Sequence, residues 1–309
     1  MNRIDVHTHT IPPLYRSWLE GRGIRDAGGR DLPAWSPAEH LDLMDRYAIA
    51  TSVVSLSTPG TWSPDRTDAL ALANAVNEYC AELVKDRPDR FGFFATTPLP
   101  DLDAALASTA HAYDDLGADG VVLLANNHGT YLGDPSLDPL LAELDRRSAV
   151  VLIHPANLPG PEVPGIPPFA VDFLLDTTRA AVNLVLNDVP RRYPNLKIIL
   201  SHGGGFVPYA AYRIAATVVA QTGRELPEIL DSLSSFYFDT ALTSSPAALP
   251  SLLAFAKPGH VLFGSDWPFA PELAVAVFSG LLDADAATGD NTLEGIHRKH
   301  AELLFPRLA

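Results

Sequence analysis

Four side chains placed at the ends of apolar runs have the chemistry of a metal site. They are His7, His9, His154 and Asp266. Residues two apart on a strand share one face and lie about 6.6 Å apart along it, so His7 and His9 can converge on one ion. Three imidazoles and one carboxylate suit a borderline divalent metal. We expect one divalent ion here, with zinc as the first choice and manganese as the alternative.

His202 also ends an apolar run, and its setting differs because Gly203-Gly204-Gly205 follows it. Three glycines allow backbone or ligand to approach closely, and a flexible turn is the alternative interpretation. Beside a metal, His202 has the properties of a general acid or base. Arg213 follows after about three helical turns. An arginine there is typical of a solvated surface, but it is also the group that an anionic substrate requires.

Eight short apolar runs that alternate with helical patterns must position these residues. Near-continuous apolar runs are typical of parallel strands covered on both faces. The alternation predicts a single (β/α)8 TIM-type barrel domain over residues 1–309, and an open doubly wound sheet is the alternative. In a barrel the carboxyl ends of the strands share one mouth, where the metal site would lie. The runs cover residues 3–9, 50–57, 90–99, 119–125, 149–156, 197–203, 236–240 and 260–268.

The segments between these runs predict helices. Ser36-Pro37-Ala38-Glu39 has the pattern of a capping box with proline at the first helical position, and it begins a helix that extends to about Tyr47. The segment 157–168 is long for a βα loop, and such loops often act as lids. Further helices are expected at residues 66–86, 101–116, 137–147, 171–193, 208–221, 246–256 and 291–304.

Composition excludes several classes of protein. The chain has 309 residues, of which 47% are hydrophobic and 19% charged, so a large core is available and disorder is not expected. A net charge of −15 disfavours nucleic acid and anionic lipid as partners. No apolar run is long enough to cross a membrane, and no secretory signal is recognised, so we expect a cytoplasmic protein. The single cysteine, Cys80, is expected in the core.

Other residues give weaker signals. His128 follows the fourth run and would lie at the same mouth of the barrel. Asp5 would either fix a ligand histidine or cap a neighbouring segment. The aromatic residues of 33–35 and 169–173 would line a planar pocket or belong to the core.

These motifs resemble the amidohydrolase superfamily, in the branch of nonoxidative decarboxylases of the aminocarboxymuconate semialdehyde decarboxylase type. The resemblance covers nearly the whole chain, and segments 91–96, 118–123, 131–134 and 176–181 are most similar to the 6-methylsalicylate decarboxylase group. The second arginine that dicarboxylate-binding members use has no clear counterpart, since Arg16 and Arg30 match no motif. The motifs are His7-x-His9, Ile153-His154-Pro155, Ser201-His202-Gly203-Gly204-Gly205, Arg213 and Gly264-Ser265-Asp266-Trp267-Pro268.

The resemblance implies a metal-dependent carboxy-lyase that releases CO2 from a small aromatic, salicylate-like carboxylate, and a homodimer or higher homo-oligomer. His7, His9, His154 and Asp266 would bind the metal, and His202 and Asp266 would be catalytic, with Asp266 favoured as proton donor. Arg213 would hold a carboxylate, and in dimeric relatives the equivalent arginine reaches the neighbouring subunit's site. The alternative is a metal-dependent hydrolase or hydratase of a small unsaturated acid or lactone. A metal-binding protein without catalysis is a third possibility.

Overall fold

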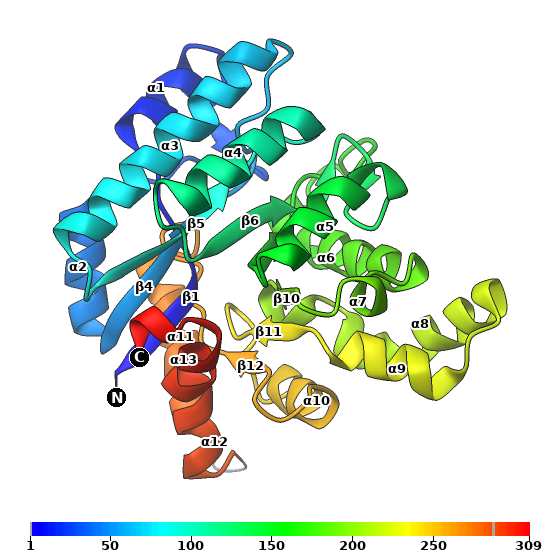
Figure 1. Cartoon of the computed structure of the whole chain (residues 1–309). Helices are drawn as coiled ribbons and strands as arrows, with labels where there is room; N and C mark the ends of the chain where they lie inside the picture. Colours follow the sequence, from blue (N-terminus) through cyan, green and yellow to red (C-terminus); the bar gives the residue numbers. More distant parts are fainter. Residues whose placement is uncertain (1, 286–287) are drawn as a thin grey trace.

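The strands form one eight-stranded parallel sheet in a computed structural model, which describes residues 2–285 and 288–309. Their order in the sheet follows their order in the chain (Figure 1). Each of the eight predicted runs overlaps one strand, although most strands are shorter than the runs. The strands are β1 Arg3–His9, β4 Ile49–Ser55, β5 Phe91–Thr96, β6 Gly120–Leu124, β9 Val150–His154, β10 Lys197–Leu200, β11 Tyr237–Asp239 and β12 Val261–Leu262.

Backbone hydrogen bonds between the first strand and the segment at β12 close this sheet into a barrel. The N–H of Val6 donates to the carbonyl of Phe263 at 3.0 Å. The N–H groups of Ser265 and Asp266 both donate to the carbonyl of His7, at 3.1 and 2.7 Å. The fold is therefore a (β/α)8 TIM-type barrel, and the open doubly wound sheet is excluded.

Helices surround the strands, and the two chain termini lie near each other in Figure 1. Three helices were not predicted from the sequence, and all of them begin without a side-chain N-cap hydrogen bond: α1 (Pro13–Glu20), α9 (Leu226–Ser234) and α11 (Glu272–Asp283). Two short hairpins were not predicted either, β2–β3 (Asp26–Ala27 and Arg30–Asp31) and β7–β8 (Asn126–Asn127 and Thr130–Tyr131). The helices are α1 Pro13–Glu20, α2 Pro37–Arg46, α3 Arg66–Asp86, α4 Leu102–Asp114, α5 Asp138–Arg146, α6 Pro168–Leu186, α7 Val189–Arg192, α8 Val207–Thr222, α9 Leu226–Ser234, α10 Ala248–Phe255, α11 Glu272–Asp283, α12 Asp290–Glu294 and α13 His300–Leu304.

Two of the helix predictions illustrate what local sequence can resolve. The capping box at Ser36 is confirmed, because its side chain accepts from the N–H of Glu39 and donates to the carboxylate of that residue. The single helix predicted over 171–193 is wrong. The chain turns after α6 at Asp188, whose φ of 58° is left-handed, and α7 then begins.

The core has two layers. Apolar side chains of most strands pack inside the barrel with Phe305 and Leu308 from the C-terminal segment. A larger cluster fills the space between the strands and the helices, and the predicted core residue Cys80 belongs to it. The interior packing fixes the strand ends that carry the polar residues. None of the helices in the described part of the chain is long and apolar enough to span a membrane.

Candidate metal centre and active site

The predicted metal ligands converge at the carboxyl ends of their strands. His7 and His9 end β1, His154 ends β9, and Asp266 follows β12. One potential ligand atom from each of these buried residues lies within 4.8 Å of the others. Asp266 Oδ1 is 3.0 Å from His9 Nε2 and 3.4 Å from His7 Nε2. The four groups therefore form one compact cluster of three nitrogens and an oxygen, as a divalent ion requires.

The three imidazoles all present the same ring nitrogen, Nε2, to the cluster. Each Nδ1 is held by a neighbour, which orients the ring and directs Nε2 toward the cluster. His7 Nε2 is buried without a hydrogen-bond partner. The residues present thus fit a metal ion well. The Nδ1 contacts are His7 with Asp239 Oδ2 at 2.7 Å, His9 with Ser55 Oγ at 3.0 Å, and His154 with the Pro155 carbonyl at 2.8 Å.

Buried charge in this cluster favours a cation. Burial by itself lowers the pKa of His7, but the charge and hydrogen bond of Asp239, with help from Asp266, raise it to about 10. Burial raises the pKa of Asp266, but the neighbouring imidazoles of His202, His7 and His9 outweigh this and hold the pKa well below its usual range. An ionised carboxylate without water needs nearby positive charge, and a divalent ion bound at the Nε2 atoms would supply it in place of a proton.

Asp239 is a functional residue that the sequence analysis did not identify. It ends β11, a strand of three residues, and it is fully buried. Besides holding His7, it accepts the backbone N–H groups of His202 and Ala241 on Oδ1, both at 3.0 Å. One carboxylate therefore orients a metal ligand and fixes the turn that carries His202. Its position at a strand end was the signal that could have identified it.

His202 lies beside the cluster in a tightly packed turn. Its Nε2 is 3.5 Å from Asp266 Oδ2, and its buried Nδ1 has no hydrogen-bond partner in the part of the chain that the structure describes. Its φ of 54° is unusual for a residue with a side chain, and such strain often marks functional positions. A Cβ on Gly205 would lie 2.2 Å from the Leu174 carbonyl of α6. The glycines therefore allow a close backbone approach, and the flexible turn is not what the structure contains.

A largely apolar cavity of about 340 Å³ lies over the metal cluster. His154, His202 and Asp266 line it on one side. Four phenylalanines make much of the remaining wall, which suits a planar aromatic ligand. The expectation for segment 169–173 is thereby confirmed, whereas Trp35 of segment 33–35 packs against His40 and Tyr79 instead. The four phenylalanines are Phe169, Phe173, Phe269 and Phe278.

Comparison with known proteins identifies the family. The sequence profile of the amidohydrolases matches residues 4–307. The chain belongs to the amidohydrolase family. It is 38% identical to the 6-methylsalicylic acid decarboxylase of Penicillium expansum over 318 residues, which cover 100% of this chain and 97% of that protein. A crystal structure of an amidohydrolase II matches with a TM-score of 0.94 and 30% identity, covering 99% of this chain and 100% of the other.

A further solved structure has the same fold with a bound metal. It is the dihydroxybenzoic acid decarboxylase of Polaromonas sp. JS666, with manganese and the inhibitor 2-nitroresorcinol. Its TM-score is 0.77 at 23% identity, and the match covers 99% of this chain and 97% of that one.

In this amidohydrolase the two arginines considered from the sequence have different positions. Arg213 is exposed on α8 and does not line the cavity. Arg30, on the short strand β3, lines the cavity and is only partly exposed. Within the described residues, its side chain has no hydrogen bond or ion pair. An unpaired guanidinium beside the metal cluster is available to an anionic ligand. No motif marked Arg30, because a hairpin brings it to the mouth of the barrel.

Asp5 of this amidohydrolase holds backbone in both segments that it was predicted to fix or cap. Its Oδ1 accepts the backbone N–H groups of the ligand histidine His7 and of Ser265, both at 3.1 Å. These bonds join β1 to the segment after β12. Burial raises the pKa of Asp5 to about 7, and the hydrogen bonds from Ser265 and His7 oppose that shift. Asp5 thus helps to close the barrel below the ligands.

Proposed function

We propose that this chain is a metal-dependent, nonoxidative decarboxylase of a small salicylate-like acid. The observation that carries the proposal is the metal cluster at the floor of an aromatic cavity, with His202 beside it and Arg30 in its wall. A planar anion with adjacent oxygens suits these surroundings. The decarboxylase relatives favour loss of CO2 over the hydrolytic alternative.

The residues of the chain bind and orient the substrate. The phenylalanine walls hold the aromatic ring and exclude water from it. The Arg30 guanidinium pairs with a carboxylate oxygen. His7, His9, His154 and Asp266 hold the divalent ion, which when bound polarises oxygens of the substrate and stabilises developing negative charge. Zinc remains our first choice, and the manganese of the Polaromonas enzyme makes manganese the principal alternative.

The proton required by the reaction comes from the pair His202 and Asp266. The proton adds to the ring carbon that bears the carboxylate. The bond between that carbon and the carboxylate then breaks and CO2 leaves. The electron pair of the broken bond restores the aromatic ring. An ionised Asp266 carboxylate must take up a proton before it can act as an acid. His202 is 3.5 Å from Asp266 Oδ2 and can supply it. Solvent then reprotonates His202.

We also propose that the enzyme is a homodimer. Two tyrosines on α8, Tyr209 and Tyr212, are 88% and 71% exposed, and Arg213 lies next to them. A second copy that covers this face would bury the tyrosines and bring Arg213 toward the cavity of its partner. In that arrangement Arg30 and the partner subunit's arginine would both face the substrate anion.

The test combines metal content with CO2 release. The purified protein is assayed for bound metal and for CO2 release from a panel of hydroxylated benzoates that includes 6-methylsalicylate. We expect about one ion per chain and CO2 release from ortho-hydroxylated acids. One ion without CO2 release from any acid in the panel would remove the decarboxylase function and shift attention to hydrolysis. Failure to bind zinc or manganese on reconstitution would contradict the metal site itself.

A further inference from the structure

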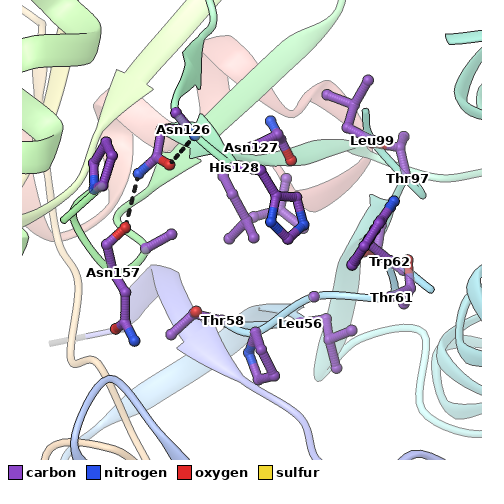
Figure 2. A pocket seen from close by; sticks show the side chains of 18 of the residues that line it. Leu56, Thr58, Thr61, Trp62, Thr97, Leu99, Asn126, Asn127, His128 and Asn157 are labelled. Atoms are coloured by element: carbon purple, nitrogen blue, oxygen red, sulfur yellow. Dashed lines mark hydrogen bonds between the residues drawn. The ribbon is translucent and has the colours of Figure 1, made fainter. Parts of the chain in front are cut away.

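A second cavity, of about 430 Å³, opens at the same mouth of the barrel. The segments that follow β4, β5, β6 and β9 line it (Figure 2). By the order of the strands in the barrel, it lies on the other side of the mouth from β12 and Asp266. Thr58 lines both cavities and marks the place where they meet. A molecule that leaves the metal cavity past Thr58 would therefore enter this second cavity.

The second cavity has no charged wall. Among the described residues that line it there is no aspartate, glutamate, lysine or arginine, and His128 is the one titratable side chain. The metal cavity, by contrast, contains Asp266 and Arg30. Moving a carboxylate from water into an uncharged, partly apolar cavity is costly unless a cation or several donors compensate it. The second cavity is therefore suited to a neutral molecule.

Polar groups in this cavity are free to bind a ligand. The side-chain amides of the adjacent residues Asn126 and Asn127 differ in their hydrogen bonding. Asn126 donates to the Asn157 carbonyl at 3.1 Å and to Asp176 at 2.9 Å, and it accepts from Gly129. The side chain of Asn127, which is only 8% exposed, makes no hydrogen bond within the described residues. Figure 2 shows it on the cavity wall.

An aromatic pair forms another part of the wall. The rings of Trp62 and His128 lie 4.1 Å apart between centroids, at 59° to each other. Trp62 is 37% exposed, although large aromatic side chains generally gain from burial. Leu56 and Leu99 add apolar surface beside it (Figure 2). The cavity thus offers a surface for a flat ring together with a neutral hydrogen-bonding group.

We propose that this cavity is a second binding site for a neutral phenol, the class of product that the proposed decarboxylation releases. The inference rests on the proposed function. Loss of CO2 converts an anionic hydroxybenzoate into a neutral phenol of similar shape. The two cavities also differ in charge, since charged side chains line the metal cavity and not the second one. A phenolic hydroxyl both donates and accepts, so it can pair with either end of the Asn127 amide. Its ring packs against Trp62. The site receives the product and rejects the substrate anion.

The test measures binding of 3-methylphenol to the metal-loaded full chain by isothermal titration calorimetry, with benzoate at saturation to fill the metal cavity. We expect one phenol to bind per chain despite the benzoate. Asn127→Leu should weaken this binding about three- to tenfold, since a neutral hydrogen bond is lost. Trp62→Ala should weaken it as well and serves if the first variant does not fold. Asn291→Leu, the same change on the exposed surface of α12, should have no effect.

Displacement of the phenol by benzoate, or equal affinity of the Asn127→Leu and Asn291→Leu variants, would overturn the second site. CO2 release in that case would leave the proposed function intact. Conversely, phenol binding as expected, with no CO2 release from any hydroxybenzoate, would keep a neutral-ligand site and remove its role in product release. In a functioning enzyme, 3-methylphenol should inhibit turnover with a mixed pattern that becomes purely competitive in Asn127→Leu.

Discussion

The two cavities at the mouth of the barrel share a border at Thr58 but differ in origin and charge. The polar groups of the metal cavity come mainly from strand ends, where His154 and Asp266 lie at fixed positions of a hydrogen-bonded sheet. The second cavity is built largely from loop residues such as Trp62 and His128. Strand ends can hold costly buried charges in place because the sheet cannot relax around them. Loops provide neutral, adaptable surface.

Removal of a metal ligand should have the largest effect, because it should abolish the function of the metal cavity and leave the second cavity intact. His154→Ala removes a nitrogen from the buried cluster, so bound metal should fall and CO2 release should drop about 10³-fold or more, since the ion supplies several kcal/mol. The binding of 3-methylphenol in the second cavity should persist. Metal analysis, CO2 release and calorimetry on the same sample check this. Full turnover with no bound metal would contradict the assignment of the cluster.

Replacement of His202 and of His128, which lie at the mouth of the barrel in different cavities, should have different effects on the rate of CO2 release. His202→Gln should lower the rate of CO2 release about 10²- to 10⁴-fold, the usual contribution of a general acid, while the metal stays bound. His128→Gln should leave that rate nearly unchanged, because His128 is exposed and lies in the second cavity. Steady-state CO2 release with metal analysis compares the two variants. Equal rates in both would remove His202 from the mechanism.

Asp239→Asn should have a smaller effect that acts through His7. The amide cannot hold His7 Nδ1 as the carboxylate does, so the ring loses the orientation and tautomer that direct Nε2 to the ion. We expect metal affinity to fall about 10- to 100-fold. Asp119→Asn is the matched control, because Asp119 is a mostly buried carboxylate that pairs with Arg307. Competition with a chelator measures both affinities. An unchanged affinity in Asp239→Asn would leave Asp239 a purely structural residue.

The smallest predicted effect concerns the substrate anion. Arg30→Met should raise KM for a hydroxybenzoate about tenfold or more, since a hydrogen bond between charged groups is lost. It should leave 3-methylphenol affinity in the second cavity unchanged. Arg25→Met removes the same charge from a nearby exposed position that does not line the cavity, and KM should stay the same. If both variants raise KM equally, the effect comes from the overall charge of the protein and not from direct contact between Arg30 and the substrate.

Much of the metal centre was predictable from sequence, because strand periodicity and strand ends are local properties. His7, His9, His154 and Asp266 all ended or followed apolar runs, and parallel strands in a barrel bring such ends together. Asp239 was missed although it has the same position. The length of its strand does not explain this, because β11 has three residues whereas β12, which precedes Asp266, has two. The helices α1, α9 and α11 were missed, and no side-chain cap marks their starts. The missing cap alone does not explain the difference, because the predicted helices α6, α8 and α10 also begin without one.

The sequence by itself determined the eight strands, the four residues of the metal cluster, the net negative charge and the supply of apolar residues for a core. Only the tertiary structure decided which polar groups face one another. It placed Arg30 in the cavity and left Arg213 exposed, although neither position follows from local pattern. It also satisfied the amide of Asn126 and left that of Asn127 free. The physical reason is that hydrogen-bond partners and cavities arise from contacts between segments distant in the chain, whereas periodicity encodes only each segment's own buried face.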